Sequence, residues 1–169
     1  MKLAIIAVGR LKDGAERDLV ERYVERARAI GRALGLASVQ LLEIPESRAR
    51  READRRAEEA AAVLDRAASS VLVAFDERGK SLSSDAFSTR IEAWRNEGRG
   101  ALSFVIGGPD GLGPEVRNAA DLVLSFGRLT LPHQLVRVLV AEQVYRAMTI
   151  LAGHPYHRAG STEPHDGSP

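Results

Sequence analysis

Short, continuous apolar runs alternate along the chain with longer stretches in which apolar residues recur every three or four positions. Continuous apolar runs are typical of strands buried on both faces of a parallel sheet. Five such runs lie at residues 3–8, 39–44, 71–75, 102–106 and 122–125. The longer stretches predict helices at residues 15–34, 48–68, 83–96 and 132–151, with a short helix beginning at Pro114. The alternation predicts an α/β fold with a mainly parallel sheet flanked by helices.

Local signals refine this pattern at two places. Residues 76–80 are polar and contain a glycine, so we expect a turn directly after the strand at 71–75. Glu142 precedes Arg146 by four positions in the last predicted helix, which is the order that favours an ion pair. The helix at 48–68 is rich in arginine and alanine and carries no recognisable motif.

Composition limits the classes of function. The 169 residues suit one domain, which we place at residues 1–158. Residues 159–169 lack an apolar anchor and are predicted to be a disordered tail. A net charge of +1 and 5% aromatic residues give neither a general basic field nor a stacking platform for single-stranded nucleic acid.

The residue types also bear on compartment and chemistry. The absence of cysteine excludes disulfides, thiolate nucleophiles and cysteine-based metal sites. No apolar stretch is long enough to span a membrane, and the first one is too short for a signal peptide. We therefore expect a cytoplasmic protein that does not contact a membrane.

Two segments end a strand in exposed backbone, which is where α/β proteins hold small polar ligands. The first, residues 104–113, is an apolar strand that leads into a glycine-rich loop. It lacks the lysine and hydroxyl of a Walker loop and the spacing of a Rossmann fingerprint, so it is either a ligand cradle or only a tight connection. The second, residues 125–132, is either a wall of exposed backbone or an irregular strand end.

A dense polar cluster follows the last predicted helix. Tyr156, His157 and Arg158 stand after Pro155, which stiffens the chain. A guanidinium suits a phosphate or a polarised carbonyl, and a histidine or tyrosine can transfer a proton. The alternative is a solvated helix end without function. No spacing of histidines and carboxylates indicates a metal site, either here or around His133.

Together these segments resemble the RlmH family, which are SPOUT-superfamily methyltransferases, over about residues 1–158. The motifs that carry the resemblance are Met1, Lys2 and Leu3 with Val8 and Gly9; residues 76–84; the loop at 106–112; residues 129–147; and the closing His154, Pro155, Tyr156, His157 and Arg158. Five motifs in the same order make chance a poor explanation of the similarity.

The resemblance implies an S-adenosylmethionine-dependent enzyme that methylates N3 of a pseudouridine in 23S ribosomal RNA, with the assembled ribosome as its expected substrate. It implies a C-terminal trefoil knot whose three backbone loops form the cofactor pocket. Those loops correspond here to Phe75, to Gly107 and Gly108, and to Gly127, Arg128, Leu129, Thr130, Leu131 and Pro132. We expect a side chain at Gly108 to enter the space of the ligand.

Members of this family are homodimers in which the second subunit is thought to complete the active site. Arg158 is the candidate for contact with a base carbonyl or a phosphate, and His157 and Tyr156 are candidates for positioning or proton transfer. Which of them acts as a base stays open. We expect the last helix to form the dimer interface, through the apolar residues Val136, Leu139, Val140, Val144 and Met148.

Two rival functions fit the same sequence. A nucleotide-binding or ribosome-binding module without catalysis could use the same glycine-rich loop. A methyltransferase of the same fold could also act on a different RNA.

Overall fold

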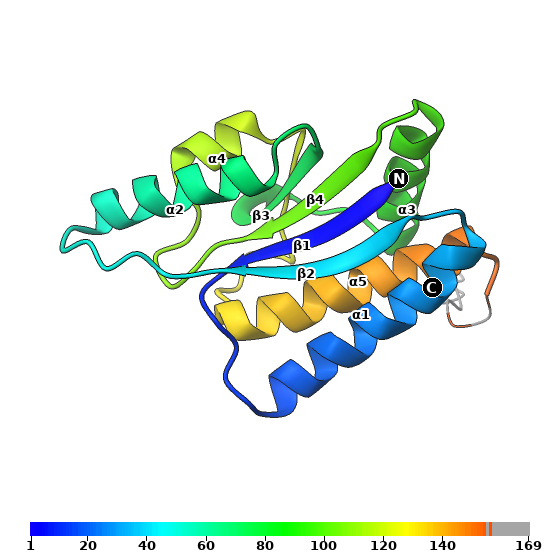
Figure 1. Ribbon diagram of the computed structural model, residues 1–169, viewed down its shortest axis with the longest axis horizontal. Coiled ribbons are helices and arrows are strands. Elements are labelled where there is room, and N and C mark those ends of the chain that lie inside the picture. Colours follow the sequence, from blue (N-terminus) through cyan, green and yellow to red (C-terminus); the bar gives the residue numbers. More distant parts are fainter. Residues whose placement is uncertain (155, 157–169) are drawn as a thin grey trace, which may run out of the picture.

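The computed structural model describes residues 1–154 and residue 156, and forms a parallel sheet of five strands between two layers of helices (Figure 1). The strands lie in the order β2-β1-β4-β3-β5 and all their pairings are parallel. The strands are β1 (Lys2–Val8), β2 (Ser38–Ile44), β3 (Val71–Lys80), β4 (Ala101–Ile106) and β5 (Leu122–Leu124). The helices are α1 (Ala15–Ala33), α2 (Glu52–Arg66), α3 (Ser84–Asn96), α4 (Pro114–Ala119) and α5 (His133–Leu151).

Each face of the sheet buries its own core because side chains alternate along a strand. In β1, Leu3, Ile5 and Ala7 pack with residues of α1, α3 and α5. Ile6 and Val8 point to the other face and pack with residues of α2 and α4. Figure 1 shows the same division, with α2 and α4 above the sheet and α1 and α5 below it. The predicted α/β class is confirmed.

The strand and helix pattern is confirmed in number and order, but two boundaries were wrong. Residues 48–51 are not helical: α2 begins at Glu52, and the arginine-rich stretch before it is a loop. The turn expected at 76–80 belongs to β3, which continues past an irregularity to pair Lys80 with Leu124. Gly79 permits this approach, since a Cβ there would lie 2.4 Å from the carbonyl carbon of Leu124.

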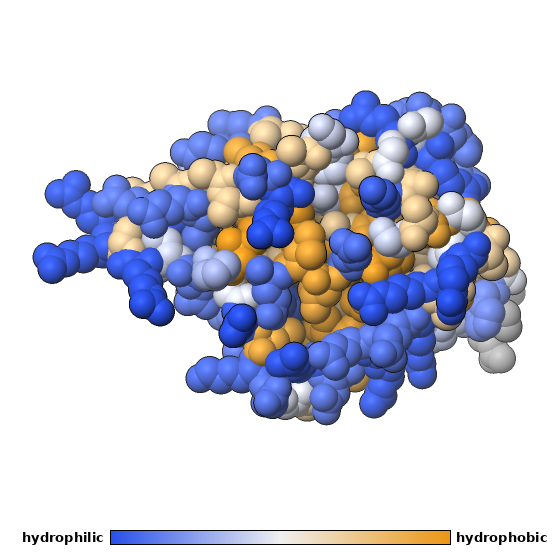
Figure 2. Space-filling model, in the orientation of Figure 1, coloured by the Kyte–Doolittle hydropathy of each residue, from blue (hydrophilic) through white to orange (hydrophobic). Residues whose placement is uncertain are grey.

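More of the apolar surface of α5 is buried in the core of its own chain than the sequence predicted. Val140, Val144 and Met148 are completely buried within the single chain, because α5 lies against α1, α3 and the sheet. The prediction that these three residues supply a dimer interface is therefore wrong. Val136 and Leu139 are half-buried. The face shown in Figure 2 has apolar side chains at its centre and hydrophilic ones at its left end, where α2 begins.

Candidate active site

The ends of β4 and β5 lie level with Phe75 of β3, and the segments beyond these points surround one cavity. Phe75 of β3 pairs with Ile106 of β4 on one side and with Leu124 of β5 on the other. The segments that follow Ile106 and Leu124, and the extension of β3 beyond Phe75, therefore all lie at the carboxyl edge of the sheet. The cavity there has a volume of about 640 Å³, within the range of small-molecule sites.

The structure brings together nearly all of the residues predicted to bind a cofactor. Those that line the cavity are Phe75, Gly107, Gly108, Gly127, Leu129, Thr130, Leu131 and Pro132. Arg128 is the exception, because its exposed side chain is not among the lining residues. Two segments that begin 32 and 52 residues after Phe75 in the sequence thus share one cavity with it.

The glycine-rich loop is folded tightly on itself. Gly108 and Gly111 form an isolated antiparallel bridge, and the Gly111 N–H donates to the Gly108 carbonyl at 3.0 Å. A Cβ at Gly107 would lie 2.7 Å from the carbonyl carbon of Gly111 and 2.8 Å from the Leu112 nitrogen. The backbone itself therefore forms this wall of the cavity, and only glycine fits at Gly107.

Gly108 does not meet the expectation that its side chain would enter the ligand's space. A Cβ there would point at the protein interior, 3.0 Å from Cγ1 of Val8 and 3.7 Å from a carboxylate oxygen of Glu59. That prediction was wrong because the loop directs the Cβ position of Gly108 toward Val8 of β1 and Glu59 of α2. A larger residue at Gly108 would displace the loop instead of filling the cavity.

Helix α2 holds the glycine-rich loop through Asp110. Arg55 donates from Nε and Nη2 to the two carboxylate oxygens of Asp110, at 2.6 and 3.2 Å. Arg56 donates from Nε to the Asp110 carbonyl at 2.8 Å. Hydrogen bonding from Arg55 lowers the pKa of the Asp110 carboxyl. These contacts were missed at the sequence level, because nothing local links α2 to a loop 55 residues away.

The opposite wall consists of residues 125–132. The ring of Phe126 stacks on that of Phe75, with centroids 5.2 Å apart and an interplanar angle of 13°. Gly127 has φ of 122° and nothing within 4 Å of a built Cβ, so the chain turns there without obstruction. Ser125 fixes the turn by accepting from the Gly127 N–H at 3.1 Å and donating to its carbonyl at 2.8 Å. The side chain of Leu129 remains 82% exposed.

Helix α5 begins at the cavity, where His133 and Val136 belong to the lining. One turn further, the guanidinium of Arg137 is buried beneath the site. It donates to the carbonyls of Val8 and Gly9 and, at 3.1 Å, to the carboxylate of Glu43. Burial lowers the pKa of Arg137. A single cation in an otherwise apolar helical stretch was the sequence signal for this buried contact.

Tyr156, the member of the C-terminal cluster that the structure describes, lies away from the cavity of its own chain. Tyr156 follows the far end of α5, a helix of 19 residues and hence about 28 Å long. Its hydroxyl donates to Glu142 at 3.2 Å, its ring lies 4.7 Å from that of Tyr145, and the guanidinium of Arg146 lies 5.0 Å from its centroid. Arg146 also donates from Nε to Glu142 at 2.9 Å, which confirms the predicted pair.

This environment restricts the chemistry of Tyr156. Burial, together with the charge of Glu142, raises the pKa of Tyr156 to about 12. The phenol is protonated at neutral pH and can donate a hydrogen bond, as it does to Glu142. The other two predicted catalytic residues, His157 and Arg158, lie outside the described residues, as does the tail at 159–169.

The extension of β3 adds polar groups to the lining. Asp76, Glu77 and Arg78 face the cavity, and Arg117 of α4 donates to Asp76 at 3.3 Å. Within residues 1–154 and 156, no cluster of three His, Asp or Glu residues could hold a metal ion. No helix in this part of the chain is long and apolar enough to cross a membrane.

Comparison with known proteins shows the family of this chain. The sequence profile of a family described as predicted SPOUT methyltransferases matches residues 1–157. The ribosomal RNA large subunit methyltransferase H of Xanthobacter autotrophicus is 59% identical over 160 residues, which cover 94% of this chain and 100% of that protein. The protein of the same name from Bradyrhizobium diazoefficiens is 57% identical over 163 residues, with the same two coverages.

A solved structure shares the fold at much lower identity. It is that of a probable methylase family protein from Haemophilus influenzae, with a TM-score of 0.50, 15% identity, and coverage of 93% of this chain and 70% of that one. The resemblance inferred from the sequence motifs is thus confirmed by both sequence comparisons. The chain belongs to the SPOUT methyltransferase family and, within it, to the ribosomal RNA large subunit methyltransferases H.

Proposed function

We propose that this protein transfers a methyl group from S-adenosylmethionine to N3 of a pseudouridine in 23S ribosomal RNA, with the assembled ribosome as substrate. The observation that carries the proposal is the cavity at the carboxyl edge of the sheet, which Phe75, the glycine-rich loop and residues 127–132 share. The family membership supports methyl transfer to large-subunit ribosomal RNA.

The residues present fit this cofactor. Gly107 brings backbone close enough to form one wall, and Gly127 and residues 129–132 line another. The stacked rings of Phe75 and Phe126 supply an apolar surface, and Asp76 and Glu77 supply negative charge. When bound, S-adenosylmethionine would supply an activated methyl on a positively charged sulfur. We also propose that these loops belong to a trefoil knot, as in the family.

Calorimetry separates the proposed enzyme from a nucleotide-binding module. The protein should bind S-adenosylmethionine in preference to ATP and NAD. Preferential binding of ATP or NAD, with no affinity for S-adenosylmethionine, would support the module. The substrate form is then decided by comparing methyl transfer to free ribosomal RNA, large subunits and whole ribosomes, of which we expect whole ribosomes to be preferred.

We propose that the active site is completed by a second copy of the chain. Tyr156 is separated from its own cavity by the length of α5, so the cluster that it begins would act in the cavity of a partner. Large apolar side chains remain exposed in the loops beside the cavity and in the first turn of α5, which suits a dimer interface there. They are Leu82, Phe126, Leu129 and Leu135.

The shared site can be tested by mixing two inactive variants. Arg158→Ala should lower methyl transfer by at least about tenfold, the effect of one lost charge-assisted contact in the transition state, with cofactor affinity unchanged. Gly107→Val should remove cofactor binding instead. In a composite site, mixed dimers of the two variants regain activity, because one of their two sites is intact. A monomer in light scattering, or mixed dimers without activity, would contradict the shared site.

The tail provides a separate check on the assignment of Arg158. Truncation after Arg158 should leave methyl transfer unchanged, because residues 159–169 contain no apolar anchor. If the truncated protein is inactive while Arg158→Ala retains activity, the catalytic assignment belongs to the tail and not to Arg158.

A further inference from the structure

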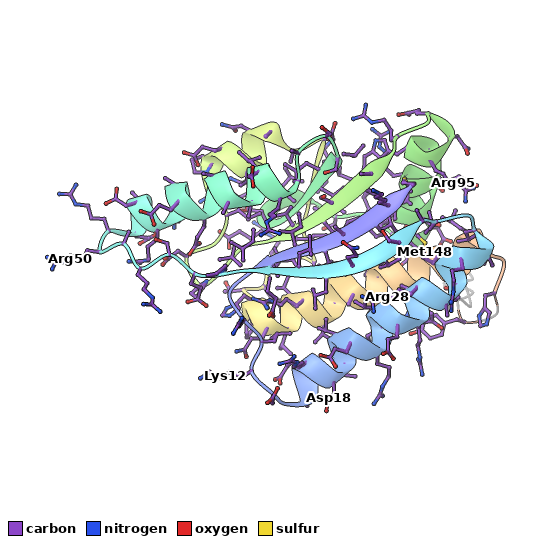
Figure 3. All side chains as sticks on the ribbon, viewed as in Figure 1. Lys12, Asp18, Arg28, Arg50, Arg95 and Met148 are labelled. Carbon is purple, nitrogen blue, oxygen red and sulfur yellow. The ribbon has the colours of Figure 1, made fainter. Side chains whose placement is uncertain are left out.

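The loop between β2 and α2 presents three arginines to solvent. We call residues 45–51 the arginine arm; it carries Arg48, Arg50 and Arg51, all of them exposed. Figure 3 shows Arg50 at the tip of this loop, pointing away from the body of the molecule. None of the three guanidiniums has a hydrogen bond or ion pair with a residue in the part of the chain that the structure describes.

The backbone of the arginine arm is nevertheless held firmly to α2. The Ser47 N–H donates to Glu59 at 2.9 Å, and the Ser47 hydroxyl donates to Glu58. Arg55 donates from one nitrogen to the carbonyls of Ala49 and Arg50, both at 3.2 Å. The arm is thus an ordered platform for side chains that themselves have no partner.

This arrangement costs stability. Glu59 is buried, and desolvation raises the pKa of its carboxyl, although the Ser47 N–H opposes the shift. Arg50 and Arg51 are adjacent like charges. Of the acidic side chains nearby, Glu58 and Glu59 hold Ser47, and Glu52 pairs with Arg56. Glu46, within the arm, lies beside Gly9 and raises the pKa of Arg137 against the lowering by burial, and Asp54 forms no ion pair with the arm among the described residues. Three exposed guanidiniums without an ion pair among the described residues, on a backbone that α2 holds in place, point to an anionic partner.

The arginine arm lies beside the cavity. A single guanidinium, that of Arg55, contacts the carbonyls of the arm and also the carboxylate of Asp110, which lines the cavity. Arg56, one residue further along α2, lines the cavity itself. A polyanion that lies across the arm would therefore pass the mouth of the site.

We propose that the arginine arm binds the sugar-phosphate backbone of the RNA that flanks the target nucleotide. This inference rests on the proposed function and names the surface that engages its substrate. Guanidinium groups match phosphate oxygens with paired N–H donors, and contacts to phosphate fix the position of a protein on RNA without reading sequence. The net charge of +1 conceals this surface because the charge is local.

The chain offers a matched control at the amino end of the sheet. Arg32, Arg66 and Arg99 precede β2, β3 and β4 and are likewise exposed, and their side chains have no ion pair with a described residue. They carry the same charge at the end of the sheet that is remote from the cavity. Replacing either set of three arginines by glutamine changes the net charge equally.

The experiment compares the two triple variants, Arg48→Gln/Arg50→Gln/Arg51→Gln and the control Arg32→Gln/Arg66→Gln/Arg99→Gln. Methyl transfer to ribosomes is measured at constant Mg²⁺ and at salt concentrations from about 50 to about 300 mM. The arm variant should raise the KM for ribosomes by at least about tenfold and lower the slope of log KM against log salt by about 2. The kcat of the arm variant and its affinity for S-adenosylmethionine should stay at the wild-type values.

Distinct results overturn the proposal. If the KM and the salt slope of the arm variant equal those of the control, the arm does not touch RNA. A raised KM with an unchanged salt slope, or a loss of cofactor affinity by calorimetry, places the arm's effect in folding or in the Asp110 loop. A lysine triple at positions 48, 50 and 51 should retain most of the salt slope, because point charges still neutralise phosphates. Wild-type protein that neither binds S-adenosylmethionine nor methylates ribosomes would refute the proposed function; ribosome binding by sedimentation would still test the arm.

Discussion

Replacing Arg137 by methionine tests how the first turns of α5 are fastened to the sheet beneath the cavity. The side chain of Arg137 is 1% exposed and donates to the carbonyls of Val8 and Gly9 and to Glu43. Methionine keeps an unbranched stem of similar reach and removes every one of these donors. The substitution therefore isolates the polar contacts of the guanidinium.

The expected loss of stability in Arg137→Met depends on how deeply Arg137 and its partners are buried. Removing one member of a buried charge pair destabilises a protein by about 3–5 kcal/mol. We expect the lower end, about 3 kcal/mol, for two reasons. The carboxylate of Glu43 is 29% exposed and keeps the N–H of Leu11 at 2.8 Å. The Nε of Arg137 has no partner among the described residues, so its removal relieves an existing penalty.

Thermal unfolding at fixed protein concentration measures this effect. For a chain of this length, about 3 kcal/mol corresponds to a Tm lower by about 6–12 °C. Arg17→Met is the control, because Arg17 forms exposed ion pairs with Asp13 and Glu21 and should leave Tm nearly unchanged. If Arg137→Met melts within about 2 °C of wild type, the desolvation of the guanidinium cancels its hydrogen bonds, and the reasoning fails.

Three further predictions follow from the site. Gly107→Val should lower affinity for S-adenosylmethionine at least about tenfold in calorimetry, since its Cβ meets the backbone of the loop, whereas Gly100→Val, with open space around its Cβ, should not. Asp110→Asn should make the free energy of unfolding depend less on pH in acid. The lowered pKa of Asp110 adds stability at neutral pH that is lost as pH falls below about 4, and acid unfolding of the variant and the wild type measures this. Tyr156→Phe should remove the rise in tyrosinate absorbance at pH about 12, and a variant that retains this rise would contradict the assignment. The raised pKa of Tyr156 adds stability below pH about 10 that is lost as pH rises to about 12.

Local sequence patterns were sufficient for the elements of this fold. Continuous apolar runs require burial on both faces, and helical spacing requires one buried stripe, so the strands and helices could be assigned without knowing their neighbours. The glycines at 107 and 108 likewise signalled a backbone-walled loop. The sequence motifs were also sufficient to identify the family, because they consist of particular residues in a fixed order along the chain.

Only the tertiary structure decided which of these pieces meet. The placement of β3 between β4 and β5 brings Phe75 level with Ile106 and Leu124, which no local pattern states. The extension of β3 through Lys80 was read as a turn because its polar residues pair with a strand 44 residues away. The direction of a Cβ at Gly108 toward Val8 also depends on contacts between distant segments.

The partners of the charged side chains were also decided only by the tertiary structure. The sequence around Arg137 is apolar and that around Arg55 is charged, but neither stretch contains the acidic partner that the side chain has in the fold. The fold pairs Arg55 with Asp110 at the cavity and buries Arg137 against the end of β1, while it leaves the arginine arm without a partner. A sequence records how polar each position is, whereas the partner of a charge, and so its chemistry, depends on which segments the folded chain brings together.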